Sequence, residues 1–126
     1  MAKALNLFNK RQQGKTYEVM AETHLRRHGL VAVARNFQCR GGEIDLIMRD
    51  RHCWVFIEVK FRQHNHYGSA AEAVNWRKQQ RIKRAALFWL QQQGHAIEHT
   101  EFRFDVVSLE GTPPQIEWFT NILVEG

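Results

Sequence analysis

Two short apolar runs in the middle of the chain alternate with a period of two, which is typical of β-strands. Residues 43–48 and 53–60 are separated by the polar residues Asp50, Arg51 and His52, so together they predict an antiparallel hairpin. In the second run, the odd-numbered residues from 55 to 59 are aliphatic and face one way. The even-numbered residues from 54 to 60 face the other way and include Glu58 and Lys60. The hairpin is therefore predicted to bury one face and to carry polar chemistry on the other.

The flanking segments predict two helices and further strands. Apolar residues recur at helical spacing from residue 16 up to Gly29, and again from residue 74 to residue 89 ahead of Gly94. Ser69 and Glu72 match a capping box, so the second helix, or a short helix before it, is expected to begin there. Residues 30–37, 102–109 and 116–120 have the composition of strands. This order predicts an α/β fold in which a mixed β-sheet is flanked by helices.

Length and composition indicate a single domain whose cysteines are not joined by disulfide bonds. The first 13 residues are polar and basic without a clear period, so we expect a flexible N-terminal arm ahead of a single domain of residues 14–126. Two cysteines are too few for a disulfide framework. The sequence shows neither a signal peptide nor an apolar run that could span a bilayer, so we expect a cytoplasmic protein with no membrane partner. The net charge of +5 favours a polyanionic partner such as nucleic acid.

The hairpin also brings together the residues with the clearest chemical potential. If Arg51 and His52 form its turn, Asp45 lies directly opposite Glu58, and Glu43 lies opposite Lys60. Opposed carboxylates repel each other on a sheet, and a divalent cation between them removes that repulsion. Mg²⁺ is commonly held by one or two carboxylates together with a substrate phosphate. Lys60 could then orient or deprotonate an attacking water, which is the chemistry of phosphodiester hydrolysis.

The alternative is that Glu58 and Lys60 form an ordinary ion-pair ladder on a strand surface, because such triplets arise often by chance. Their surroundings favour the catalytic interpretation. Glu58 lies in an apolar run, and Asp45 is likewise surrounded by Ile44, Leu46 and Ile47. Unpaired charges are costly to bury, so charged residues in these positions point to a specific role.

A longer series of motifs resembles a known family. It comprises Arg35-Asn36-Phe37, Gly42-Glu43-Ile44-Asp45-Leu46-Ile47, Phe56-Ile57-Glu58-Val59-Lys60, Gly68, Ala73-Val74, Lys78 and Arg103-Phe104-Asp105-Val106. This order of motifs, from about residue 14 to residue 107, resembles the YraN-like family of small bacterial proteins. The resemblance implies a restriction-endonuclease-like fold, similar to archaeal Holliday junction resolvases, with an active site of the D…E-x-K type.

Carried over to this chain, the resemblance implies that Asp45 and Glu58 are metal ligands and that Lys60 is the catalytic lysine. It also implies Glu18, on the first helix, as an additional acidic residue. The chain departs from the family pattern at two positions. Tyr17 stands where the family generally has glycine, and Phe61 stands where a small hydroxyl residue is usual.

The leading hypothesis is a nuclease that uses one or two Mg²⁺ or Mn²⁺ ions to cut DNA, with branched or junction DNA as a candidate substrate. The alternative is a non-catalytic nucleic-acid-binding or assembly module that retains the fold. A homodimer is expected, because resolvases need two symmetrically placed sites. Candidate phosphate-binding residues, from the ends of the hairpin strands and from the second helix, are Arg40, Arg62, Arg77, Lys78 and Arg81.

Overall fold

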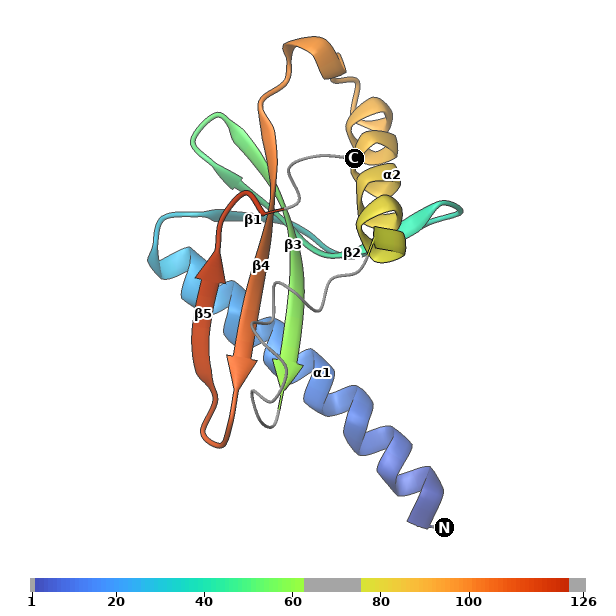
Figure 1. The fold of residues 1–126 in the computed structure, drawn as a ribbon, viewed down its shortest axis with the longest axis vertical. Coiled ribbons are helices and arrows are strands. Elements are labelled where there is room, and N and C mark those ends of the chain that lie inside the picture. Colours follow the sequence, from blue (N-terminus) through green and yellow to red (C-terminus); the bar gives the residue numbers. More distant parts are fainter. Residues whose placement is uncertain (1, 63–75, 123–126) are drawn as a thin grey trace.

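The computed structural model of the chain describes residues 2–62 and 76–122. In these ranges it has a mixed five-stranded sheet, in the order β1-β2-β3-β4-β5, and two long helices (Figure 1). Only β3 and β4 are parallel, and every other neighbouring pair is antiparallel. The elements are α1 (Ala2–Arg27), β1 (Val31–Cys39), β2 (Gly42–Asp50), β3 (Cys53–Arg62), α2 (Trp76–Gln92), the short 3-10 helix η2 (Ile97–His99), β4 (Phe102–Glu110) and β5 (Gln115–Phe119). The predicted α/β fold with a mixed sheet flanked by helices is confirmed, and it is consistent with a restriction-endonuclease-like fold.

Each face of the sheet packs against one helix. On one face, Ile82 and Trp89 of α2 pack with Phe56 of β3. On the other face, Leu25 of α1 packs with Ile57 of β3. Two buried faces explain why residues 55–58 of β3 are buried without interruption, because a strand between two layers needs apolar side chains on both sides. Within the described ranges, no helix is long and apolar enough to cross a lipid bilayer.

The first helix is longer than the sequence pattern predicts. It begins at Ala2, so the backbone of residues 2–13, for which the sequence predicts a flexible arm, is helical. Thr16, expected near the helix start, lies inside the helix and donates a hydrogen bond from its hydroxyl to the carbonyl of Gln12 at 2.8 Å. The N-terminal part of α1 extends past the sheet (Figure 1). A helical segment that packs on no core has no need of an apolar stripe, which is why periodicity did not reveal it.

The hairpin forms in the predicted register. Met48 pairs with Val55 and Asp50 pairs with Cys53, which leaves Arg51 and His52 as the turn. Arg51 has a positive φ of 58°, as a residue of such a tight turn can require. The remaining strands lie within a few residues of their predicted positions. The capping box of Ser69 and Glu72 lies outside the described residues.

Candidate active site

The site lies where β2 and β3 separate. Their ladder ends at the pair Leu46–Ile57, although the register would place Asp45 opposite Glu58 next. Instead of a backbone carbonyl, the Asp45 carboxylate accepts the Val59 backbone N–H at 2.8 Å. The side chain of Asp45 thus occupies the place of a ladder acceptor, which fixes it beside Glu58.

A local irregularity in β1 accompanies this separation. Asn36 falls between the pairs Arg35–Leu46 and Phe37–Ile44, so it lies across from Asp45 without being paired to it. Its φ is 52°, in the left-handed region that asparagine tolerates better than most residues. The regular backbone pairing of β2 is therefore broken on both sides of Asp45. The carboxylate of Asp45 is held by the backbone N–H of Val59 instead.

Burial and neighbouring charge make Asp45 difficult to ionise. Burial, followed by the charge of Glu58, raises the pKa of Asp45 from 3.8 to about 7. The hydrogen bond from Val59 and the charge of Lys78 act in the opposite direction without cancelling the shift. The like-charge repulsion expected from the sequence is present, and a cation between the two carboxylates would relieve it.

Two lysines meet at Glu58, whose residue exposure is only 4%. The ammonium Nζ of Lys78 lies 2.8 Å from Glu58 Oε1, and that of Lys60 lies 3.7 Å from the same oxygen. Burial lowers the pKa of Lys60, and the nearby Lys78 adds to this against the opposing charge of Glu58. Burial would also lower the pKa of Lys78, but its hydrogen bond and ion pair with Glu58 raise it instead. Lys60 is thus the easier of the two lysines to deprotonate, whereas the raised pKa of Lys78 keeps it positively charged.

Glu18 reaches the same region from α1. Burial raises its pKa, the side-chain hydrogen bond with Asn36 lowers it, and the charge of Glu58 raises it again. A cavity of about 160 Å³ opens beside it, lined in part by Lys15, Asn36 and Leu46. Of the residues predicted from the sequence, the structure brings Asp45, Glu58 and Lys60 together, with Glu18 close enough to interact electrostatically with Glu58.

Glu43 is not part of this cluster, and the prediction that it lies opposite Lys60 is wrong. Its carboxylate accepts a hydrogen bond from Arg81 Nη2 at 2.5 Å. The cause is the path of this end of β2, which follows α2 after the ladder with β3 ends. Gly42 allows this approach, because a Cβ there would lie 2.0 Å from the carbonyl oxygen of Arg81. Glu43 and Gly42 attach β2 to α2.

The predicted phosphate-binding residues differ in their surroundings. Arg40 in the β1–β2 turn and Arg77 at the start of α2 are exposed. Arg62 is half-buried at the end of β3, where its register partner on β4 is Glu110. Lys78 belongs to the Glu58 cluster, and Arg81 is paired with Glu43. The exposed pair is therefore the best placed to meet an extended anion without first breaking an ion pair.

The donor set suits a hard divalent cation that keeps several waters. Among the described residues, no group of three His, Cys, Asp or Glu side chains could hold a metal ion together. Two carboxylates, Asp45 and Glu58, remain, and Mg²⁺ is often bound by one or two carboxylates plus substrate phosphate. The absence of a cysteine or histidine in the pair disfavours zinc. Asp45 and Glu58 thus fit Mg²⁺ or Mn²⁺ as the residues that would hold it.

A second buried acid was not identified as special from the sequence. Asp105 of β4 is fully buried and accepts hydrogen bonds from Trp118 Nε1 at 2.9 Å and from the Asn121 N–H at 2.8 Å. Arg103 Nε also donates to it at 3.1 Å, while Arg103 Nη1 donates to Asp50 at 3.1 Å. An aspartate in an otherwise apolar strand was the available signal. These contacts give the Arg103–Asp105 part of the motif series a structural role.

The fold and this cluster define a class: an α/β protein in which a buried and a half-buried carboxylate from neighbouring strands meet two lysines. The family described as uncharacterised protein family UPF0102 matches residues 17–109 of the chain. The chain belongs to this family, which corresponds to the YraN-like family that its motifs resemble.

Similar proteins occur in several bacteria. The chain is 70% identical to a UPF0102 protein of Photobacterium profundum over 118 residues, which cover 94% of each chain. It is 50% identical to a UPF0102 protein of Aliivibrio fischeri, over 94% of this chain and 96% of the relative. A UPF0102 protein of Yersinia pseudotuberculosis serotype O:1b is 50% identical over 90% of this chain and 95% of the relative. None of these names states an activity.

Proposed function

We propose that the protein is a Mg²⁺- or Mn²⁺-dependent endonuclease that hydrolyses phosphodiester bonds of DNA. The observation that carries this proposal is the convergence of Asp45 and Glu58 from adjacent strands with the amine of Lys60, 3.7 Å from Glu58. The buried Glu58 and the half-buried Asp45, whose pKa is raised by burial and by Glu58, are suited to hold one or two hard cations. An amine on the same strand face supplies a proton-handling group next to them.

The residues divide the work as follows. Asp45 and Glu58 would hold the cation, which supplies positive charge that polarises the scissile phosphate. Lys60, whose pKa burial lowers, orients the attacking water and accepts its proton. Lys78 remains charged and offsets the negative charge that develops on the phosphate oxygens. Glu18 borders the site and offers a further acidic group next to the pair.

The basic surface and the expected dimer complete the proposal. Arg40 and Arg77 are exposed and could bind flanking phosphates, while Arg62, Lys78 and Arg81 would contribute once DNA displaces their present partners. Because bacterial DNA lies in the cytoplasm, the proposal includes a cytoplasmic location for the protein. A homodimer would supply the two sites that a junction substrate requires, and analytical ultracentrifugation measures that state directly.

The test is cleavage of linear, flap and four-way-junction DNA by the purified full-length protein, with Mg²⁺, with Mn²⁺ and with EDTA. We expect metal-dependent products from the wild type and none from Lys60→Ala or Asp45→Asn. Glu117→Gln is the matched control, because it neutralises an exposed carboxylate on β5 outside the site. Absence of cleavage with every substrate and both metals, by a protein that is folded, rejects the enzymatic proposal.

One observation favours a second candidate, a non-catalytic DNA-binding or assembly module. Lys78 already forms a 2.8 Å ion pair with Glu58, so part of the acidic charge is neutralised by the protein itself. Such a module would bind DNA in a salt-dependent manner without metal. Wild-type DNA affinity of Asp45→Asn, together with no heat of Mg²⁺ binding in calorimetry, supports this candidate over the nuclease.

A further inference from the structure

An aromatic pair joins α1 to the end of β3 on the face of the sheet that α1 covers, opposite the face on which Glu58 and Lys60 meet Lys78 of α2. The rings of Tyr17 and Phe61 are stacked, with centroids 3.9 Å apart and planes inclined by only 8°. Tyr17 directly precedes Glu18, and Phe61 directly follows Lys60. The two positions at which the chain departs from the family pattern are therefore in contact with each other. Because Phe61 covers one face of the Tyr17 ring, that ring is held in a fixed orientation.

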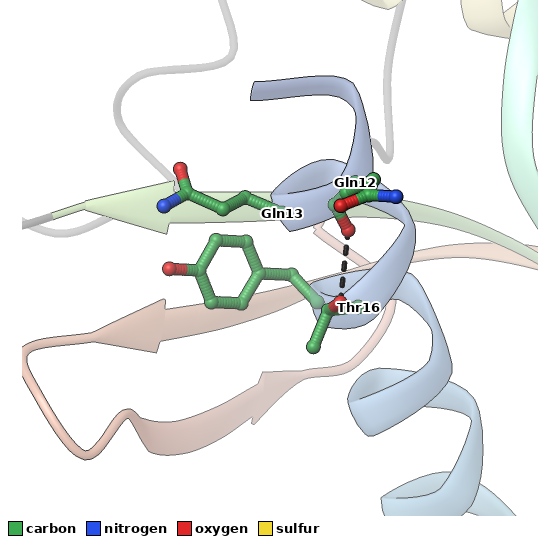
Figure 2. A pocket seen from close by; sticks show the side chains of 4 residues that line it. Gln12, Gln13 and Thr16 are labelled. Carbon is green, nitrogen blue, oxygen red and sulfur yellow. Dashed lines mark hydrogen bonds between the residues drawn. The ribbon is translucent and has the colours of Figure 1, made fainter. Parts of the chain in front are cut away.

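A polar pocket of about 300 Å³ lies beside Tyr17 (Figure 2). Its lining residues are Gln12, Gln13, Thr16 and Tyr17, all on α1. In Figure 2, Gln13 extends away from the helix, whereas Thr16 lies beside Gln12 and hydrogen-bonds to its backbone carbonyl. Within the described part of the chain, neither glutamine amide has a hydrogen-bond partner. The pocket therefore offers amide donors and acceptors next to an aromatic ring.

This combination matches the chemistry of a nucleobase. A base presents a flat π-face, which stacks on aromatic side chains, and an edge of donors and acceptors, which amides can pair. The volume lies at the lower end of the range for small-ligand sites, ~300 to 1,000 Å³, which is adequate for one base. Among the described residues that line the pocket none is charged, and their amide and hydroxyl groups can pair with the edge of a base.

The surroundings supply attraction for the backbone that would carry such a base. The stretch of α1 ahead of Glu18 contains lysines and an arginine but no acidic residue. This part of the helix projects beyond the sheet (Figure 1), where an approaching strand can reach it. Lys15 is exposed on a neighbouring face of the same helix, where it lines the cavity beside Glu18 and can meet a phosphate of the bound strand.

We propose that this pocket binds one unpaired base of the DNA, stacked on the ring of Tyr17, and so selects DNA with unpaired nucleotides next to the site of cleavage. This inference rests on the proposed function, since it specifies the substrate of the same site. A paired base is stacked within a duplex and cannot enter the pocket, whereas a base in an overhang, flap or junction can. Tyr17 and Gln13 are thus assigned as substrate-selecting residues.

The test measures binding of full-length protein in EDTA, so that cleavage does not contribute. The probes are a blunt duplex and the same duplex with a single-stranded overhang that contains 2-aminopurine, whose fluorescence falls when it stacks. The wild type should prefer the overhang and quench the probe. Tyr17→Leu should weaken overhang binding by at least about fivefold, matching the ~1 kcal/mol lower limit for stacking one base, and should abolish quenching. Tyr17→Phe should behave as the wild type.

Two further variants keep the result interpretable. Phe88→Leu removes an aromatic ring that is 46% exposed on α2 and should change neither affinity nor quenching. Gln13→Ala alters only an exposed side chain and should weaken overhang binding by about twofold to tenfold, so it decides the matter if Tyr17→Leu fails to fold. Equal wild-type affinity for both probes overturns the inference, as does full quenching and affinity in both Tyr17→Leu and Gln13→Ala.

Cleavage assays separate this inference from the proposed function. Metal-dependent cleavage with no preference for unpaired nucleotides overturns the pocket assignment and leaves the nuclease intact. Overhang-specific binding and quenching without cleavage supports the pocket and rejects the nuclease. No binding to either probe overturns the pocket assignment, and it rejects the nuclease as well only when metal-dependent cleavage is also absent.

Discussion

Two aspartates in this protein, the half-buried Asp45 and the fully buried Asp105, have opposite surroundings. Asp105 accepts hydrogen bonds from Arg103, Trp118 and Asn121, one of which is a cation. Asp45 accepts a hydrogen bond from Val59 and faces the negative charge of Glu58, which together with burial raises its pKa to about 7. A carboxylate whose charge is compensated by protein donors links structural elements. A carboxylate whose charge is not fully compensated is stabilised when a cation binds. The comparison separates a structural acid from a candidate metal-binding acid.

The largest effect should come from the structural acid. Asp105→Ala removes the acceptor for three donors and, among the described residues, leaves Asp50 as the one acidic partner of Arg103. We expect the free energy of unfolding to fall by about 3 to 5 kcal/mol, the usual cost of breaking a buried ion pair. Urea unfolding followed by circular dichroism measures it, with Glu117→Gln as a control that should change stability by less than about 0.5 kcal/mol. A loss below about 1 kcal/mol would show that Asp105 is not the structural member of the comparison.

The next effect should come from metal at the other acid. Mg²⁺ that binds only the folded protein stabilises it by about 2.7 kcal/mol at a concentration 100 times Kd. We expect Tm to rise with added Mg²⁺ in the wild type and to stay constant in Asp45→Asn. Differential scanning calorimetry measures both. An equal rise in the two proteins would place the cation elsewhere and remove the functional half of the comparison.

A pH dependence of stability should follow from Asp45. Its pKa in the folded protein is raised, so between pH 3.8 and about 7 the folded state binds more protons at this group than the unfolded chain does. The free energy of unfolding therefore falls as pH rises through this window, because Asp45 must ionise beside Glu58 in the folded protein. Below the window Asp45 is protonated in both states and this destabilisation is absent. In metal-free buffer we expect Asp45→Asn to be more stable than the wild type above pH 7, by about 1 to 3 kcal/mol, and similar near pH 4. Chemical unfolding across this range tests the sign, and a variant that is less stable at high pH contradicts it.

The smallest effect should come from the lysine that partly compensates the site. The charge of Lys78 lowers the pKa of Asp45, although less than burial and Glu58 raise it. Lys78→Gln should therefore shift the titration midpoint of Asp45 slightly upward, whereas Lys83→Gln on the same helix should leave it unchanged. Carboxyl ¹³C chemical shifts report the midpoint directly. A downward shift in Lys78→Gln would mean that Lys78 acts on Asp45 by a route other than charge.

The sequence predicts the parts of this site that depend on local pattern. Alternation in residues 53–60 and the polar turn at Arg51 and His52 fix the hairpin register, and that register brings Asp45 toward Glu58. It cannot predict where the ladder ends, because that depends on the left-handed backbone of Asn36 and on contacts with α2. Extending the ladder too far is what placed Glu43 opposite Lys60.

Charged partners across long sequence separations were also beyond reach. The helical stripe indicated that Lys78 points toward the sheet, but its 2.8 Å contact with Glu58 depends on how α2 docks. Asp105 is joined to Trp118 and Asn121 through the β4–β5 pairing, which no local pattern encodes. The N-terminal half of α1 was missed for a different reason, since helix propensity without packing leaves no periodic signal.

The close approach of β2 to α2 depends on the absence of a side chain at Gly42. Because Gly42 has no Cβ, its backbone contacts the backbone of Arg81 directly. This contact fixes the strand that carries Asp45 against the helix that carries Lys78. A methyl group at this position would clash with the backbone of Arg81 and move β2, which carries Asp45, away from α2, which carries Lys78. The spacing of charge in the candidate active site is thus set by a residue that carries no charge and no side chain.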